Sequence, residues 1–172
     1  PAWVTTVHGP YSVNFYSRIM TSGERVIAIS EFIHAYITQH YPLVAPAQIR
    51  IIPRGVDRQH YVHGYLPPPS WIANWRSQFP QFEGRRLLVL AGRITRWKGH
   101  ADFIEMLAEL VRRDPSVHGL IAGGASDSRL DFERELKTLA ATHGLNDHLT
   151  FLGKRDDLRD ILALADIAYS LT

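Results

Sequence analysis

A regular alternation of apolar runs and amphipathic segments from Leu87 onward constrains the fold of this chain more than any other feature. The apolar runs are LLVLAG, VHGLIAGG, HLTFLG and DIAYSL, and the segments between them carry apolar residues on one helical face. Short, continuous apolar runs are typical of strands that are buried on both faces of a sheet. Because helices connect consecutive strands, the pattern predicts a Rossmann-like α/β fold with a mostly parallel sheet and flanking helices.

Strand-like segments also precede this region. WVTTVHG and RVIAIS read as strands, Ser30 is a suitable N-cap for a helix over residues 31–41, and IRIIPRGVD reads as a strand that runs into a turn. The proline-rich segment GYLPPPSW then predicts an extended connection. We therefore expect one α/β domain to end, with its connection, within residues 1–66 and a second to occupy residues 67–172.

Composition excludes several classes of protein. The chain has 172 residues, no cysteine and a formal net charge of +2, which leaves no disulfide framework and no thiolate metal site. No apolar run approaches the ~20 residues that a membrane span needs. The histidines show no metal-type spacing, so we predict no metal. The basic residues are scattered, which argues against a nucleic-acid stripe but leaves anionic small molecules and a membrane surface open.

The stretch GRITRWKG, residues 92–99, lies where a strand passes into a helix. The carboxyl ends of parallel strands and the amino ends of helices favour anions. Arg93 can present a planar fork to phosphate oxygens, Lys98 adds a compact charge, and the glycines allow close backbone approach. A surface turn with solvated basic residues is the alternative reading.

Three other places hold candidate residues. Gly123 and Gly124 follow a strand and form either a tight turn or a wall against a ligand. In the turn GKRDD, Asp156 or Asp157 can cap the following helix, and the turn could also border a nucleotide base. His8 ends the first strand, where it is either a structural or a catalytic histidine.

The order of these segments resembles family 4 of the retaining glycosyltransferases, which have the two-domain GT-B fold. The matching segments span essentially the whole chain and are TVHG, RVIAISEFI, IRIIPRGVD, GRITRWKG, IAGG, FLGKRDD and LALADIAYSLT. The forms of IPRGVD and GRITRWKG are similar to the bacterial branch that builds lipopolysaccharide or capsule. The resemblance implies an acceptor-side domain ending within residues 1–66 and part of a donor nucleotide-binding domain in residues 67–172.

The resemblance also implies roles for the candidate residues. Arg93 and Lys98 would bind the diphosphate of a nucleotide-sugar donor and stabilise it as leaving group, and His8 would face the donor sugar. These three residues are the expected catalytic set, with no cofactor or metal, because protein cations neutralise the diphosphate. The residues expected to line the nucleotide pocket are Gly123, Gly124, Arg155 and Asp157.

The chain departs from the family pattern at both ends. It begins with Pro1 and stops at Thr172, directly after a strand-like segment. Members of the family have a glycine-rich loop before the first of these segments and an acidic motif with two glutamates after the last. We therefore expect an excerpt that is truncated at both ends and inactive by itself. Arg54 stands where many members have asparagine, so it receives no role from the resemblance.

The implied partners are a nucleotide-diphosphate-sugar donor and a sugar or lipid-linked acceptor, with no nucleic acid. The expected location is the cytoplasm, with peripheral association at the inner membrane face as a further option. Three alternatives remain at this stage: a non-catalytic nucleotide-binding module, a nucleotide-sugar epimerase of the same fold, and a binder of polyanions or membrane surfaces. A glycoside hydrolase is disfavoured because no carboxylate pair is identifiable.

Overall fold

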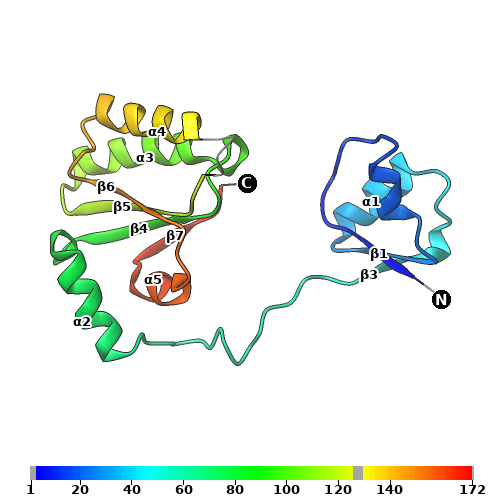
Figure 1. The fold of residues 1–172 in the computed structure, drawn as a ribbon, viewed down its shortest axis with the longest axis horizontal. Coiled ribbons are helices and arrows are strands. Elements are labelled where there is room, and N and C mark those ends of the chain that lie inside the picture. Colours follow the sequence, from blue (N-terminus) through cyan, green and yellow to red (C-terminus); the bar gives the residue numbers. More distant parts are fainter. Residues whose placement is uncertain (1–2, 126–129, 172) are drawn as a thin grey trace. The chain divides into compact units, whose positions relative to one another are not determined.

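The computed structural model describes residues 3–125 and 130–171 (Figure 1). The chain divides into two compact units, Pro1–His60 and Tyr61–Thr172. Residues 61–66, which the sequence assigned to the connection after the first domain, belong to the second unit. The Tyr65 hydroxyl donates a hydrogen bond to Asp160 Oδ1 at 2.6 Å and accepts one from Arg159 Nη2 at 2.7 Å, and these bonds tie the segment to the second unit.

The first unit is a parallel sheet of three strands in the order β1-β2-β3. Its core joins β1 and β2 to one face of α1, where Ile33 and Ile37 are buried. The predicted cap is confirmed, because Ser30 Oγ accepts a hydrogen bond from the Ile33 backbone at 3.2 Å. The elements of this unit are β1 (Val4–Val7), η1 (Ser17–Thr21), β2 (Arg25–Ala28), α1 (Glu31–His40), η2 (Pro46–Gln48) and β3 (Ile49–Ile51).

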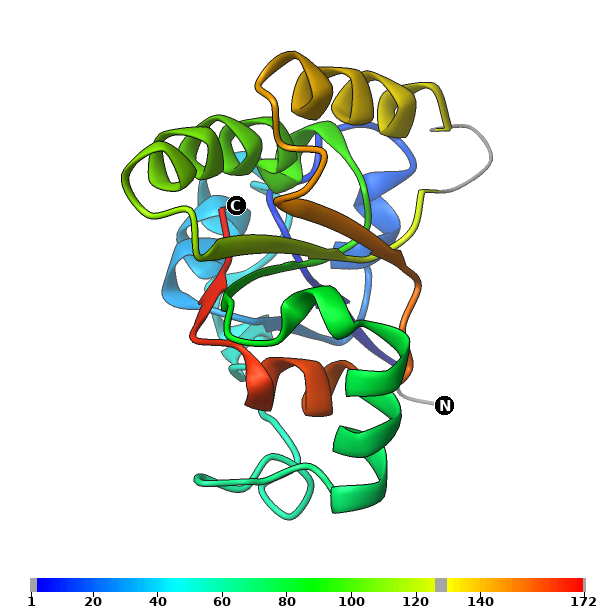
Figure 2. The same ribbon diagram turned by 90° about the vertical axis from the view of Figure 1, so that its left-hand side faces the viewer.

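The second unit is a parallel sheet of four strands in the order β6-β5-β4-β7. Helices α3 and α4 cover one face, and α2 and α5 cover the other (Figures 1 and 2). The predicted parallel α/β fold with flanking helices is confirmed. Its elements are α2 (Pro69–Gln78), η3 (Pro80–Phe82), β4 (Arg86–Ala91), η4 (Arg96–Lys98), α3 (His100–Arg113), β5 (Val117–Ala122), α4 (Leu130–Thr142), β6 (Leu149–Gly153), α5 (Leu158–Leu164) and β7 (Ile167–Tyr169).

The two faces of this sheet bury separate apolar clusters. Along β4, Leu88 and Leu90 belong to the cluster under α3 and α4, whereas Leu87 and Val89 belong to the cluster with α2 and α5. Successive side chains of a strand point to opposite faces, so a strand covered on both sides must be apolar throughout. This requirement explains why β4 has no polar alternation. Within the described part of the chain, no helix is long and apolar enough to cross a membrane.

Candidate functional site

The loop between β4 and α3 is held against the end of β5. The Gly92 N–H donates to the carbonyl of Ala122 at 3.0 Å, and the Ile94 N–H donates to the carbonyl of Gly124 at 3.1 Å. Ile94 is buried in the cluster under α3. The hydrogen bonds to the end of β5 and the burial of Ile94 therefore fix the conformation of the loop. The loop lies at the carboxyl edge of the sheet, where the sequence predicted a ligand.

The two glycines that follow β5 differ in their surroundings. A Cβ atom on Gly123 would lie 1.8 Å from the carbonyl oxygen of Gly92, so the two backbones touch and no side chain fits between them. A Cβ atom on Gly124 would meet nothing nearer than the backbone nitrogen of Lys154, at 3.7 Å. Gly123 also bridges to Gly153, which brings the end of β6 to the same edge. The ends of β4, β5 and β6 thus meet here.

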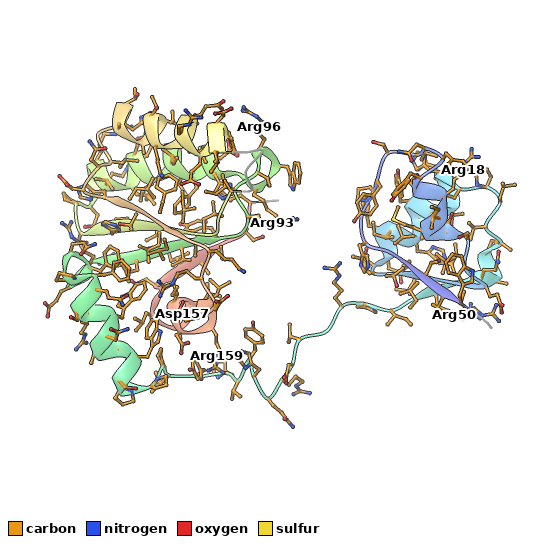
Figure 3. All side chains as sticks on the ribbon, in the orientation of Figure 1. Arg18, Arg50, Arg93, Arg96, Asp157 and Arg159 are labelled. Carbon is orange, nitrogen blue, oxygen red and sulfur yellow. The ribbon has the colours of Figure 1, made fainter. Side chains whose placement is uncertain are left out.

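The basic residues of the β4–α3 loop have different environments. Arg96 Nη2 pairs with Glu135 Oε2 at 2.9 Å and its guanidinium lies 4.5 Å from the centre of the Phe132 ring, so it joins the loop to α4. Arg93 is exposed, and its side chain forms no ion pair within residues 3–125 and 130–171. The stem of Lys98 lies over Gly92, with Cδ 3.7 Å from the position of a Cβ there. Figure 3 shows Arg93 and Arg96 on this loop.

The start of α3 lies directly beyond these residues. Gly99 has φ +66°, a left-handed conformation that favours glycine, and a Cβ atom there would lie 2.5 Å from Leu171 Cβ. Gly99, the N-cap residue of α3, has no side chain, and within residues 3–125 and 130–171 no side-chain hydrogen bond caps the first turn of the helix. The leading N–H groups of α3 and the helix dipole favour an anion at the same place as Arg93 and Lys98.

His100, the first residue of α3, is a feature that the sequence analysis missed. Its side chain is fully buried, and neither ring nitrogen has a hydrogen-bond partner in the part of the chain that the structure describes. Burial lowers the pKa of His100 and the Lys98 charge lowers it further, whereas the nearby backbone carbonyls of Thr95 and Gly92, which lie outside hydrogen-bonding geometry, oppose the change. The neutral ring packs beneath the loop. No sequence signal distinguishes this histidine from a solvated one.

Arg155 and Asp157 bind each other at the start of α5. Arg155 donates from Nε to Asp157 Oδ1 at 2.8 Å and from Nη2 to Oδ2 at 2.6 Å, and the Trp71 indole donates to Oδ2 at 2.9 Å. These donors, Arg155 first, lower the pKa of Asp157. Asp157 stands at the N-cap position of α5, but in the described part of the chain its side chain makes no capping hydrogen bond. The predicted side-chain cap is wrong for Asp157 because Arg155 and Trp71 occupy the carboxylate.

His8 belongs to the first unit, unlike the other predicted site residues. It follows β1 and is exposed. Its Nδ1 atom lies 2.8 Å from Nη2 of Arg54, which comes three residues after the end of β3. The contact joins the ends of the two outer strands of the sheet. The sequence singled out His8 but gave no reason to pair it with Arg54.

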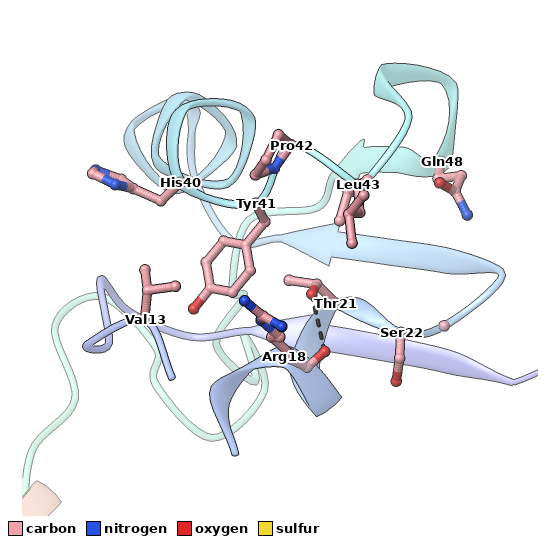
Figure 4. A pocket seen from close by; sticks show the side chains of 11 residues that line it. Val13, Arg18, Thr21, Ser22, His40, Tyr41, Pro42, Leu43 and Gln48 are labelled. Carbon is pink, nitrogen blue, oxygen red and sulfur yellow. Dashed lines mark hydrogen bonds between the residues drawn. The ribbon is translucent and has the colours of Figure 1, made fainter. Parts of the chain in front are cut away.

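A pocket of about 410 Å³ lies elsewhere in the first unit (Figure 4). Arg18, Tyr41 and Leu43 are among the residues that line it. None of the predicted site residues lines this pocket. Among the residues with described positions, no group of three or more histidine, aspartate or glutamate side chains could hold a metal ion.

Two family models match the chain. The model of glycosyl transferases group 1 matches residues 72–171, and the model of Glycosyltransferase Family 4 matches residues 1–60. The two matches fall on the two compact units of the structure.

Individual relatives agree with these models. D-inositol 3-phosphate glycosyltransferase of Saccharomonospora viridis is 32% identical over 72% of this chain and 28% of its own length. The lipopolysaccharide core biosynthesis mannosyltransferase LpsB of Rhizobium meliloti is 32% identical over 68% of this chain and 32% of its own length. The crystal structure of Anabaena Alr3699/HepE with UDP and glucose is 23% identical, with a TM-score of 0.81 over 97% of this chain and 45% of that one. The chain spans 22% to 37% of the length of eight curated relatives, including the two transferases named above.

Proposed function

The chain belongs to the glycosyl transferases group 1 and has the α/β architecture of GT-B glycosyltransferases, and we propose that the full-length protein transfers a hexose from a nucleotide-diphosphate-sugar donor to an acceptor with retention of configuration. In this proposal residues 67–172 bind the donor, and residues 1–66 belong to the acceptor side. The complex of the structural relative HepE with UDP and glucose supports a nucleotide-sugar donor.

The observation that carries the proposal is the convergence at the carboxyl edge of the second sheet. The backbone contact of Gly92 with Gly123 brings the strand ends together, and the uncapped start of α3 lies beside Lys98. Arg93 is exposed on the same loop, whereas Arg96 is held by Glu135. One guanidinium, one ammonium and a set of backbone N–H groups suit the many oxygens of a diphosphate.

The same arrangement explains how the chain would accelerate the reaction. When the bond between sugar and diphosphate breaks, negative charge grows on the diphosphate oxygens. Arg93 and Lys98 would interact with that charge more strongly in the transition state than in the bound donor, and only such differential binding lowers the barrier. Backbone hydrogen bonds fix the β4–α3 loop before the donor binds. The N–H groups and charged residues of the loop therefore need little reorganisation during the reaction.

The remaining residues take supporting roles in the proposal. His8 would face the donor sugar and donate a hydrogen bond to it. Gly123, Gly124 and the paired side chains of Arg155 and Asp157 would border the nucleotide.

The acceptor we propose is a sugar or a lipid-linked sugar of a cell-surface glycan. The similarity to LpsB, which is named for lipopolysaccharide core biosynthesis, supports this class of product. We place the reaction in the cytoplasm, at the inner membrane face where the acceptor is lipid-linked.

Calorimetric titration of the full-length protein with UDP, GDP and ADP tests the donor site. Each of Arg93→Ala and Lys98→Ala should weaken binding of the preferred nucleotide by on the order of 1.5 to 3 kcal/mol, because each removes a charge-assisted hydrogen bond to phosphate. The same titration with the corresponding nucleoside should show no such loss, since the phosphates are missing.

Arg113→Ala is the matched control for net charge, because Arg113 lies on α3 at the end away from the loop. Its affinity for nucleotide should equal that of the unsubstituted protein. If Arg93→Ala and Lys98→Ala bound the nucleotide as tightly as the Arg113→Ala control, the proposed diphosphate site would be wrong.

A further inference from the structure

The contact between His8 and Arg54 supports an inference that neither the family models nor the relatives supply. We propose that Arg54 is a positioning residue, which holds the His8 ring in one orientation with its hydrogen on Nε2. The effect on catalysis rests on the function proposed above, whereas the effect on the ring does not.

The sheet of the first unit places the two side chains. β1 and β3 are its outer strands and β2 lies between them, so His8 and Arg54 approach across the carboxyl end of β2. The segment after β3 is fixed there, because the Ile52 N–H donates to the carbonyl of Ala28 at 2.9 Å. Arg54 therefore starts from an anchored backbone when it reaches Nδ1 of His8 at 2.8 Å.

The chemistry of the two groups determines the direction of the hydrogen bond. A guanidinium carries N–H donors and no acceptor, so Arg54 Nη2 donates and His8 Nδ1 accepts with its lone pair. A neutral imidazole has one donor and one acceptor nitrogen. The hydrogen of His8 is then on Nε2, and within the described residues the Nε2 atom has no hydrogen-bond partner.

This state suits the role proposed for His8. The hydrogen bond from Arg54 fixes the orientation of the His8 ring and leaves the hydrogen on Nε2. The Nε2–H group can then donate to an oxygen of the ligand, such as a sugar hydroxyl, and the ring need not first change tautomer or rotate. Histidine tautomers in functional sites are commonly set by the partner of the other ring nitrogen. Arg54 thereby acts on the substrate only through His8.

The ring itself is tested by NMR of the full-length protein labelled with ¹⁵N-histidine. Long-range ¹H–¹⁵N spectra at pH 8 separate a protonated ring nitrogen from one with a free lone pair, and the His8→Gln variant assigns the His8 signals. We expect a protonated Nε2 and an accepting Nδ1, and a change in the Nδ1 signal in Arg54→Ala. A proton on Nδ1, or His8 signals that Arg54→Ala leaves unchanged, would overturn the proposal.

Transferase kinetics test whether Arg54 acts through His8. We expect Arg54→Ala to lower kcat/KM by about tenfold, in line with the loss of one charge-assisted hydrogen bond, and Arg54→Lys to restore part of it. In a His8→Ala background the Arg54→Ala change should cost little more, because the group that it positions is gone. An equal loss in both backgrounds would show that Arg54 acts independently of His8.

Arg50→Ala is the matched control for both experiments. Arg50 lies on β3, which precedes Arg54, and among the described residues its side chain donates only to the backbone carbonyls of Ala47 and Ile49. We expect it to change neither the His8 signals nor kcat/KM. A protein that showed the expected ring state but no transferase activity would contradict the proposed function while supporting the role of Arg54 on the ring.

Discussion

At the scale of single residues, His118 is the buried ionisable group with the clearest consequence for stability. It lies on β5 with 3% of its surface exposed, Nε2 contacts Thr150 Oγ1 at 2.9 Å, and the ring packs against Phe82. Burial lowers its pKa from 6.5 to about 4, and the nearby charges of Arg85 and His148 act in the same direction. The folded protein therefore holds this ring neutral at pH values where the unfolded chain protonates it.

This difference predicts a loss of stability in mild acid. Between pH 6.5 and 4 the unfolded state binds more protons than the folded state, so the free energy of unfolding falls as the pH falls. His118 alone should contribute a loss of about 2 kcal/mol between pH 7.5 and 5. Urea denaturation at a series of pH values measures it. The His118→Gln variant should lose most of this slope, and an unchanged slope would contradict the assignment.

The candidate residues show what could be predicted at this scale. Arg93 and Lys98 were identified correctly as parts of one loop, because their positions after a strand and before a helix are local in sequence. The different environment of Arg96 could not be predicted, since its partner Glu135 is on another helix. The hydrogen bond between Trp71 and Asp157 could not be predicted either, because the two residues are 86 positions apart in the sequence.

At the scale of elements, the junction of β4 and β5 depends on the glycine that lies between two backbones. Gly123→Ala would place a methyl group 1.8 Å from the Gly92 carbonyl oxygen, and a backbone oxygen cannot rotate away as a side chain can. Gly124→Ala meets no atom closer than 3.7 Å. The adjacent substitutions therefore form a matched pair with the same chemical change.

We expect Gly123→Ala to destabilise the fold by about 2 kcal/mol or more and Gly124→Ala by about 0.5 kcal/mol or less. Chemical denaturation of both variants gives the comparison. Gly123→Ala should also weaken nucleotide binding, because relief of the clash moves the loop that holds Arg93. Equal stabilities for the two variants would mean that the backbones do not touch as described.

At the scale of the whole molecule, each compact unit has its own core. Among the described residues, the first unit, Pro1–His60, buries one apolar cluster, whereas the second, Tyr61–Thr172, buries one on each face of its sheet. A unit of about 60 residues buries a smaller fraction of its surface than a larger one and is correspondingly marginal. The two units should therefore differ in stability.

Differential scanning calorimetry of this chain should then resolve two transitions, the first unit melting at the lower temperature. If the diphosphate site belongs to the second unit, UDP should raise the temperature of the upper transition alone. At a hundredfold excess over the dissociation constant, UDP should increase the free energy of unfolding of this unit by about 2.7 kcal/mol. At the same UDP concentration, Lys98→Ala should reduce the shift to half or less, because it weakens nucleotide binding. A shift of the lower transition alone would place the nucleotide on the first unit.

The sequence by itself determined the layered α/β architecture and the loop of Arg93 and Lys98, because both follow from local patterns: apolar periodicity defines strands and helix faces, and glycine with basic residues defines the turn between them. Only the tertiary structure decided which residues meet across the strand order β6-β5-β4-β7 and across β1-β2-β3. It paired Arg54 with His8, set Gly123 against Gly92 and buried His100. Such contacts depend on how strands distant in sequence lie side by side, which no local pattern encodes.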